Sequence, residues 1–341
     1  ISIECDMTAL INSTVEYEAG QSQQAFAAMT DAGAHTIFTL ATKPWSATTG
    51  FEYAVVPYGI ATGGVISPAA AAGNNNVDVA AFTAYAPGMT GASATTGLIS
   101  VSAATNIAAT RGTTNGYRIT SITVDSTGTV VAVSGTESTA FSETRGAAGG
   151  PPLIPVGSIE IGQVRFSSIT AAVVASTEIY QVVGTHQERY DYPVWSEDPI
   201  RGQVTFSSAL PLIHTGSVAK KVMARVATPI YAVIEPARNW KPADVSNSAS
   251  SEQYYNHKTV GSFTTSQGQA SFDVSLNDGV SDAVLSKMGL NLLWRYKPDL
   301  YRAPYQITQG VGSIARTNTA GASPTATITI SVQQPSVDFA S

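Results

Sequence analysis

The sequence is poor in charged residues. Lys, Arg, Asp and Glu together make up 12% of the 341 residues, about half of the share that globular domains usually carry. Hydrophobic residues still account for 43%, which excludes a disordered chain, because disorder requires low hydrophobicity together with high charge. A chain of this length usually exceeds what one hydrophobic core can organise, so we expect two domains.

Cysteine and clustered basic residues are also scarce. Cys5 is the only cysteine, so a disulfide within the chain and a cysteine-based metal site are excluded. This composition fits assembly in a reducing compartment. The net charge is −6, and Lys220-Lys221 is the only pair of adjacent basic residues. A protein that binds nucleic acid through phosphate contacts needs a basic patch, so the sequence argues against that class.

Long hydrophobic runs and catalytic motifs are missing as well. No apolar run reaches the roughly 18 residues of a membrane span, and no segment has the pattern of a signal peptide. GVGSIA, which begins at Gly310, has the letters of a dinucleotide-binding fingerprint, but the turn-rich RTNTAGASP follows it where a helix is required. We attribute these glycines to strand bends or to close approach of the backbone.

One short segment, GTHQERYDYP, carries His186, Glu188 and Asp191. These residue types can ligate a metal or act as acid and base. No second group of His or Cys completes such a site, so we interpret the segment as a polar loop. We therefore expect neither an enzyme nor a bound cofactor or metal.

Small and β-branched residues dominate what is present, and they favour strands. In Ala270–Leu276 the apolar residues alternate with Ser and Asp, and in Thr325–Val332 they alternate with Thr and Ser. A period of two residues is typical of a sheet with one buried face. Tyr117–Gly135 predicts a hairpin that turns at Ser126-Thr127-Gly128. We expect an all-β fold of two sandwich or partial-barrel domains.

Two short helices are expected within this fold. The first lies between Gly20 and Gly33, and the second is DAVLSKM, capped by Ser281 and ended by Gly289. The glycine- and proline-rich GAAGGPP, Gly146–Pro152, is the best domain boundary. It divides the chain into residues 1–150 and 151–341.

A polar stretch between Pro236 and His257 is long enough to leave the sheet, and loops of that length are often functional or disordered. Trp240, Tyr254 and Tyr255 lie in it. We expect these aromatic residues to contact another subunit or to pack in the core. A second interpretation is that they stack on the faces of sugars.

The order of elements from Lys258 to Gln334 carries a family resemblance. A strand hairpin (HKTVGSFTTSQGQASFDVSL), one short helix (SDAVLSKMG), an aromatic strand (LNLLWRYK) and a closing strand (SPTATITISVQ) follow one another. Upstream, ALPLIHTGSVAKKVMARVATPIYAVIEPARNW looks like a long hairpin region. Together they resemble the major tail tube proteins of long-tailed, non-contractile bacteriophages, over about half of the chain.

The resemblance implies a structural virion protein. Six subunits would form a ring, rings would stack into a tube, and DNA would pass through it as cargo without specific binding. Residues 151–341 would build the tube, and residues 1–150 would be an accessory domain or outer decoration. The partners would be further copies and other tail proteins, with no membrane. The protein would assemble in the host bacterial cytoplasm and reside in the virion tail.

Two other classes stay open. The chain could be a phage fibre, a capsid-decoration protein or an adhesion protein that binds a host-surface glycan or protein. A β-sandwich hydrolase is the third class, and no motif favours it. A tube subunit would order the stretch from Pro236 to His257 only in the assembly, whereas a glycan-binding protein would keep it ordered alone.

Overall fold

The computed structural model describes residues 13–46, 53–71, 73–86, 97–253, 259–276, 283–301 and 303–340. In this part of the chain nearly every regular element is a β-strand, and the helical elements are the short 3-10 helices η1 (Ser176–Glu178) and η3 (Ala283–Lys287). The strands form several antiparallel sheets, none of them closed. The predicted all-β fold class is confirmed. No described helix has the length and apolarity needed to span a membrane.

The chain divides into two compact units. Unit 1 consists of Ile1–Gln23, Lys43–Tyr53 and Ala227–Ser341, and unit 2 consists of Gln24–Thr42 and Ala54–Val226. Unit 2 is thus inserted into unit 1, and the chain passes between the units four times.

The units do not correspond to the expected halves of the chain, because the segment around residue 150 lies inside unit 2. Gly146–Pro152 is a compact loop there. Gly149 N–H donates to the carbonyl of Thr136 at 2.8 Å, and Gly150 N–H donates to Ala147 at 3.0 Å. The glycines of this segment serve a local turn, with positive φ at Gly146 and Gly149.

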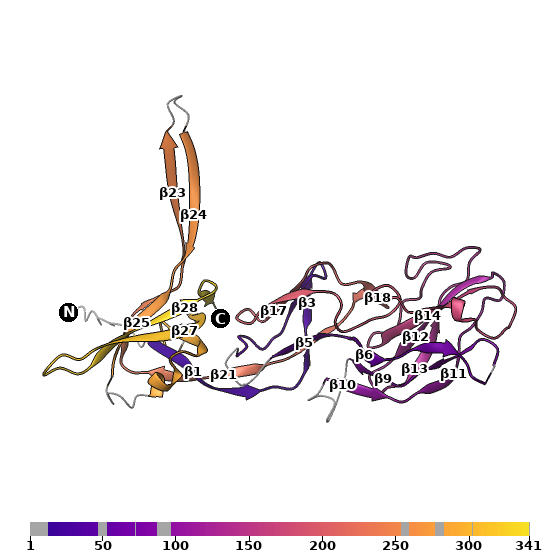
Figure 1. Cartoon of the computed structure of the whole chain (residues 1–341), viewed down its shortest axis with the longest axis horizontal. Coiled ribbons are helices and arrows are strands. Elements are labelled where there is room, and N and C mark those ends of the chain that lie inside the picture. The colour runs from indigo at the N-terminus through magenta and orange to yellow at the C-terminus, as the bar shows by residue number, and fades with distance from the viewer. Residues whose placement is uncertain are drawn as a thin grey trace, which may run out of the picture. The chain divides into compact units, whose positions relative to one another are not determined.

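Unit 1 is built on one open sheet of eight strands (Figure 1). Its order is β21 (Ala227–Ile234), β1 (Thr14–Gln23), β26 (Asn291–Lys297), β27 (Tyr305–Thr317), β28 (Thr325–Val332), β25 (Ala270–Ser275) and β22 (Ala237–Lys241), with β29 (Val337–Phe339) also paired to β27. Every pairing is antiparallel.

The core of unit 1 lies on one face of this sheet. The alternation predicted for Ala270–Leu276 and Thr325–Val332 is confirmed, because Phe272 and Val274 are buried beside Ile328 and Ile330. η3 adds Val284 to the same cluster. The sheet curls around the cluster, since Trp240 of β22 stacks on Tyr296 of β26 although β25, β28 and β27 separate these strands in the sheet.

Unit 2 contains the remaining sheets. The larger ones are β10 (Leu98–Val101), β9 (Phe82–Tyr85) and β6 (Gly59–Gly63); β11 (Ala104–Ala108), β8 (Asn76–Val79) and β7 (Ile66–Pro68); and β13 (Val130–Ser134), β12 (Tyr117–Val124), β14 (Ile159–Ser167) and β15 (Ile179–Tyr180). Apolar side chains from these sheets, among them Phe82, Val77 and Ile161, share one buried cluster.

The smaller sheets of unit 2 are β16 (Trp195–Asp198), β17 (Gln203–Phe206), β4 (Ile37–Thr39) and β3 (Thr30–Gly33); β18 (Leu212–His214) and β19 (Val218–Ala219); and β2 (Ala27–Ala28), β20 (Val222–Arg225) and β5 (Ala54–Pro57). The first of these sheets has its own aromatic contact, with Phe38 packed edge-on against Phe206 at 5.5 Å between ring centroids.

The predicted helix between Gly20 and Gly33 is wrong. The segment instead contains the end of β1 followed by β2 and β3, which pair with β20 and β4. Its apolar residues, Phe26 and Met29 among them, are too few for a helical stripe, and pairing with distant strands determines the local structure. The second predicted helix is a 3-10 turn, η3, followed by Gly289 at φ +82°. Its expected cap, Ser281, lies outside the described residues.

One predicted hairpin is confirmed and one is wrong. β12 and β13 pair as expected, with Gly128 in their turn at φ +85°. In the segment His257–Leu276 the two expected strands do not pair with each other. β24 (Thr259–Gln267) pairs with β23 (Val245–Gln253), whereas β25 pairs with β22 and β28. The glycine at 268 therefore marks a change of partner rather than a hairpin turn.

The glycines of GVGSIA lie on β27, where close approach of neighbouring groups explains them, as predicted. A Cβ atom at Gly312 would come within 2.7 Å of Cζ2 of the buried Trp294. We expect Gly312→Ala to lower the free energy of unfolding of the protein by about 1–3 kcal/mol, because the indole must shift within a packed core.

The matched control for this prediction is Gly20→Ala in β1 of the same sheet. The nearest group to a Cβ atom there is Ile230, at 4.0 Å, so the substitution is expected to leave stability nearly unchanged. Denaturant unfolding, followed by tryptophan fluorescence, measures both variants. Equal stabilities for the two variants would contradict the steric account of Gly312.

Candidate functional site

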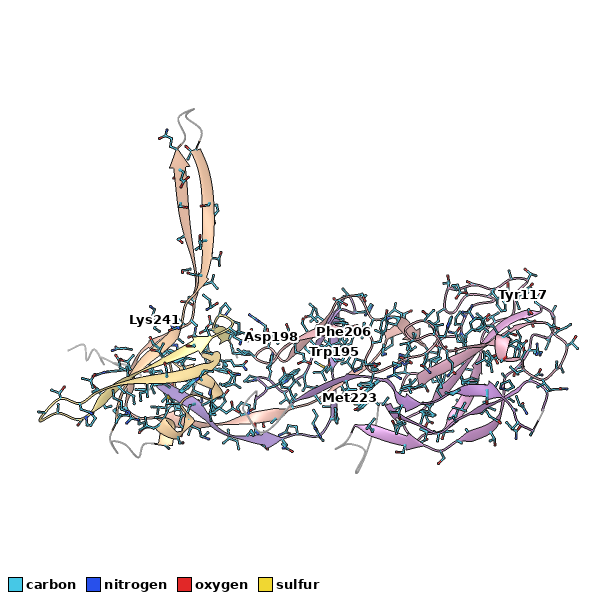
Figure 2. All side chains as sticks on the ribbon, viewed as in Figure 1. Tyr117, Trp195, Asp198, Phe206, Met223 and Lys241 are labelled. Atoms are coloured by element: carbon cyan, nitrogen blue, oxygen red, sulfur yellow. The ribbon has the colours of Figure 1, made fainter. Side chains whose placement is uncertain are left out.

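The most exposed element of the structure is a hairpin formed by β23 and β24, which we call the arm. Figure 1 shows it projecting from the sheet of unit 1. Nine residue pairs hold it together, from Val245↔Gln267 to Gln253↔Thr259, and all nine residues of β23 are exposed. Figure 2 places Lys241 near the point where the arm leaves the sheet. The described side chains of the arm therefore bury neither face within their own subunit.

Hydroxyl and amide side chains cover the arm. Ser246 bonds to Ser266 across the strands at 2.8 Å between their hydroxyl oxygens, and Ser250 bonds to Ser262 at 2.6 Å. The large apolar side chains among the described residues of the arm include Val245 and Phe263, which are 44% and 81% exposed. A two-stranded hairpin without further packing is marginally stable in water, so these cross-strand bonds alone stabilise the arm weakly.

The base of the arm is firmly attached to unit 1. The backbone of buried Ala243 bonds to Ser336 in both directions: its N–H donates to Ser336 Oγ at 2.9 Å, and its carbonyl accepts from Ser336 N–H at 3.0 Å. Gly268 N–H donates to the carbonyl of Asp244 at 2.9 Å. The direction in which the arm leaves the sheet is thus fixed by backbone contacts at its first residues.

The aromatic residues proposed from the sequence have different positions. Trp240 lies on β22, half-buried, and its Nε1–H donates to Gln306 Oε1 at 2.7 Å. Its ring stacks on Tyr296 with 5.6 Å between centroids and 8° between planes. Trp240 therefore packs on the core of unit 1. Tyr254 and Tyr255 lie outside the described residues.

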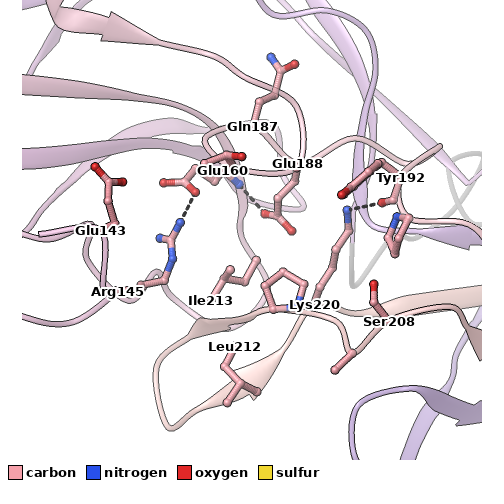
Figure 3. A pocket seen from close by; sticks show the side chains of 15 residues that line it. Glu143, Arg145, Glu160, Gln187, Glu188, Tyr192, Ser208, Leu212, Ile213 and Lys220 are labelled. Atoms are coloured by element: carbon pink, nitrogen blue, oxygen red, sulfur yellow. Dashed lines mark hydrogen bonds and ion pairs between the residues drawn. The ribbon is translucent and has the colours of Figure 1, made fainter.

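A second candidate site is a cavity of about 470 Å³ in unit 2 (Figure 3). Its charged and polar lining comes from separate elements. Arg145 lies in the loop that follows β13, Glu160 lies on β14, Glu188 and Tyr192 follow β15, and Lys220 follows β19. The rest of the lining is Glu143, Gly184, Thr185, Gln187, Pro193, Ser208, Ala209, Pro211, Leu212 and Ile213.

Glu160 is buried and has several partners. Its carboxylate accepts hydrogen bonds from Arg145 and from the hydroxyl of Ser121, and Gln163 Nε2 donates to it at 3.2 Å. Burial raises the pKa of Glu160, and the Arg145 guanidinium acts in the opposite direction. Such a paired and hydrogen-bonded carboxylate is the form in which a buried charge is tolerated.

Glu188 and Lys220 are less completely paired. Glu188 Oε2 accepts from the backbone N–H of Glu160 at 2.7 Å, whereas its Oε1 has no hydrogen-bond donor among the described residues. Lys220 Nζ donates to the carbonyls of Arg189 and Tyr192 at 2.8 and 3.2 Å. The two side chains form no direct ion pair, although both are more than nine-tenths buried.

Burial also shifts the pKa values of Glu188 and Lys220. It raises the pKa of Glu188 to about 7, and it lowers the pKa of Lys220. The lysine ammonium favours the ionised form of Glu188, and the nearby Glu160 opposes it. Glu188 therefore titrates near neutral pH, which is common for groups at functional sites.

The structure separates the three residues of the segment GTHQERYDYP that sequence analysis considered together. Glu188 faces the cavity, His186 Nε2 accepts from Arg165 at 3.0 Å, and Asp191 pairs with Arg189 at 3.0 Å. Within the described ranges no group of three His, Cys, Asp or Glu side chains is arranged to hold a metal ion.

Glu160 and Lys220 were not predicted as site residues. For Glu160 the available signal was a lone charged residue inside an apolar strand pattern, IPVGSIEIGQVRF, whereas Lys220 stands in the pair Lys220-Lys221 and has no such signal.

Comparisons with known proteins found no match: no protein family, no curated protein and no solved structure resembles the chain at a significant level.

Glu188 makes the stability of unit 2 depend on pH. Its pKa in the folded protein is raised above the ordinary 4.5 to about 7. The folded state therefore holds this proton more tightly, and the corresponding stability is lost as pH rises through 7. Glu188→Gln, which cannot ionise, should be more stable than the parent at pH 8 by on the order of 1–3 kcal/mol, and the difference should shrink at pH 5.

Glu143→Gln is the matched control, because Arg165 lowers the pKa of Glu143. This change should destabilise the protein at pH 8 or leave it unaffected, the opposite sign to that of Glu188→Gln. Urea unfolding at pH 5, 6, 7 and 8 measures both series. A Glu188→Gln variant that is less stable than the parent at every pH would contradict the account.

Proposed function

We propose that the chain is a structural virion protein that assembles with further copies of itself into the stacked rings of a phage tail tube, and that it catalyses no reaction. The arm is the observation that carries this proposal. It is a well-formed hairpin of nine pairs in the single chain, contrary to the expectation that a tube subunit orders this stretch only in the assembly, but its described side chains bury neither face. A surface outside the subunit must supply the missing burial.

The low stability expected for the arm alone favours a partner surface. Ordering one residue of backbone costs about 1–2 kcal/mol of conformational entropy. Within unit 1 the arm gains backbone bonds and a few hydroxyl bonds but buries almost no apolar area. Its two outer edges also offer main-chain donors and acceptors, which can pair with an edge strand of another chain.

A second copy of the chain is the partner that best fits the arm. Glu252 is the only charged residue among the described residues of β23 and β24. An arm without basic residues does not suit a nucleic acid or an anionic surface. It matches the chain's own surface, which is also low in charge, and the open sheet of unit 1 ends in the edge strands β21 and β22.

The charge of the chain agrees with this proposal. A net charge of −6 repels the phosphates of DNA rather than holding them. A tube built of such subunits can pass DNA as cargo. Hexameric rings and the other tail proteins as partners belong to the same proposal.

Self-assembly is tested by negative-stain electron microscopy over a concentration series, with mass measured by light scattering. Rings or tubes with a central hole support the proposal. A stable monomer or trimer that never stacks refutes it, and binding to a host-surface glycan or protein then becomes the leading function.

The role of the arm is tested by removing it. In the variant, an Asn-Gly turn joins Ser246 directly to Ser266, which pair in the parent. The subunit should keep its fold and its unfolding midpoint, because the arm contributes no core residue, whereas ring stacking should be lost. Assembly that survives the deletion at the same concentration would exclude the arm from the interface.

A point substitution refines this test. Phe263→Ser removes the most exposed large apolar side chain of the arm and should raise the concentration needed for assembly about tenfold or more, since a buried aromatic residue at an interface commonly contributes about 2 kcal/mol. Val131→Ser, at an exposed position on β13 of unit 2, is the control and should leave assembly unchanged. Equal effects of both substitutions would point to general surface hydrophobicity instead.

A further inference from the structure

We propose that the cavity of unit 2 is a binding site for a neutral polyhydroxylated ligand, a saccharide unit, held between Glu188 and Lys220. This inference goes beyond tube assembly and does not depend on it, because every residue that lines the cavity belongs to unit 2.

The first observation is the incomplete hydrogen bonding of two buried charged side chains. Glu188 Oε1 has no donor among the described residues. An ammonium group has three protons, and Lys220 uses two of them on backbone carbonyls. Glu188 Oε1 is not among the fully buried side-chain atoms that lack a partner, so it is accessible from the cavity. A ligand that accepts from Lys220 and donates to Glu188 uses the hydrogen-bonding capacity that remains on both groups.

The second observation concerns the charges that surround the pair. Glu160 is paired with Arg145, and Glu143 is paired with Arg165. The lining thus contains both carboxylates and cationic groups. An anionic ligand would meet the carboxylates, and a cationic ligand would meet Lys220 and Arg145. A hydroxyl group is donor and acceptor at once, so a neutral polyol can bond to both kinds of group without bringing in an unpaired charge.

Figure 3 shows how the two side chains reach the space they would share. Glu188 comes from the segment after β15, and Lys220 comes from the chain beside β18 and β19. The lysine amine lies close to the carbonyl of Tyr192, and the carboxylate lies close to the backbone of Glu160. These backbone bonds fix both groups in position before a ligand arrives.

The third observation is the edge of the cavity. Tyr192 is 52% exposed there, next to Pro193 and Leu212 in the lining. Gly184, at φ +78°, lies under its ring, and a Cβ atom at 184 would come within 2.5 Å of Tyr192 Cε1. The ring is thus held against the backbone with part of its surface open. An aromatic face beside a few fixed polar groups is the usual composition of a small-molecule site.

The size of the cavity suits a ligand of this class. Its volume of about 470 Å³ lies within the roughly 300–1,000 Å³ of ordinary ligand pockets. The lining divides into polar groups around Glu188 and Lys220 and an apolar edge at Tyr192. Sugars have the same two kinds of surface, with hydroxyl groups around the ring and apolar C–H faces above and below it.

A charge series of similar sugars tests the proposal on the intact chain at pH 7.5. Saturation-transfer NMR and titration measure binding of D-glucose, D-galactose and N-acetyl-D-glucosamine, with D-glucuronate as the anionic analogue and 6-amino-6-deoxy-D-glucose as the cationic one. At least one neutral sugar should bind more tightly than both charged analogues. Its addition should shift the backbone amide signals of residues 188, 192 and 220.

Substitutions assign the binding to the cavity. Glu188→Gln should weaken binding of the preferred neutral sugar about tenfold, the effect of one charge-assisted hydrogen bond. Tyr192→Ala should weaken sugar binding as well. Tyr192→Phe should bind the sugar like the parent, because only the aromatic ring is required. Asp198→Asn, which changes an ion pair of unit 2 outside the cavity lining, is the control and should bind like the parent.

The outcomes separate the sources of the sugar and decide the proposal. Binding of monosaccharides supports a free sugar as ligand. Retention on dextran beads without monosaccharide binding supports a polysaccharide, provided that Tyr192→Ala abolishes it. Because Tyr192 is half-exposed, the Tyr192 variants test the site independently of any change that Glu188→Gln makes to stability. Tighter binding of either charged analogue would overturn the proposal. It would also be overturned if no neutral sugar shifted residues 188, 192 and 220 and retention on dextran did not depend on Tyr192.

Discussion

The pairing of β1 with two strands from the other end of the chain is the constraint on which the architecture depends. Val15 lies opposite Ile234, and Tyr17 lies opposite Trp294. Unit 1 can therefore complete its sheet and its core only after the whole of unit 2 has been synthesised. The entropy of closing so long a loop grows only with the logarithm of its length, so the insertion is tolerated. Such non-local contacts slow folding more than they reduce stability.

The same strand also carries buried charge. Glu16 pairs with Arg295, and Glu18 accepts from the backbone N–H of Leu293 at 3.2 Å and from the hydroxyl of Ser46. Removing a partner of a buried charge is far more damaging than removing an exposed ion pair. These contacts specify where β1 must lie, because a shift of one residue would exchange the carboxylates with Val15 and Tyr17 on the core face.

Local patterns predicted many of the strands, but apart from the hairpin of β12 and β13 they did not predict which strands pair. The alternation in Ala270–Leu276 is visible in the sequence because each buried residue is two positions from the next. The partner of Thr259–Gln267 is not visible, since VSNSASSEQ on β23 has no apolar alternation and is a strand only through its pairing. The positions of Glu160 and Lys220 depend on strands far away in the sequence. No local pattern distinguishes a buried charged residue from an exposed one in such a chain.

The arm and the cavity depart from the rest of the fold in opposite ways. The arm has ordered backbone without burial, and the cavity has two buried charged residues, Glu188 and Lys220, that form no ion pair with each other. Replacing buried charges by apolar residues often leaves a fold as stable or more so, so stability alone does not account for Glu188 and Lys220 in a chain that has few charged residues. Strand formation alone does not account for an arm that exposes both of its faces. Both proposals assign the missing interactions to another molecule. In the first, a further copy of the chain completes the burial of the arm, and in the second, a sugar unit bonds to Glu188 and Lys220. Because the arm belongs to unit 1 and the cavity to unit 2, the two requirements can be met by different molecules.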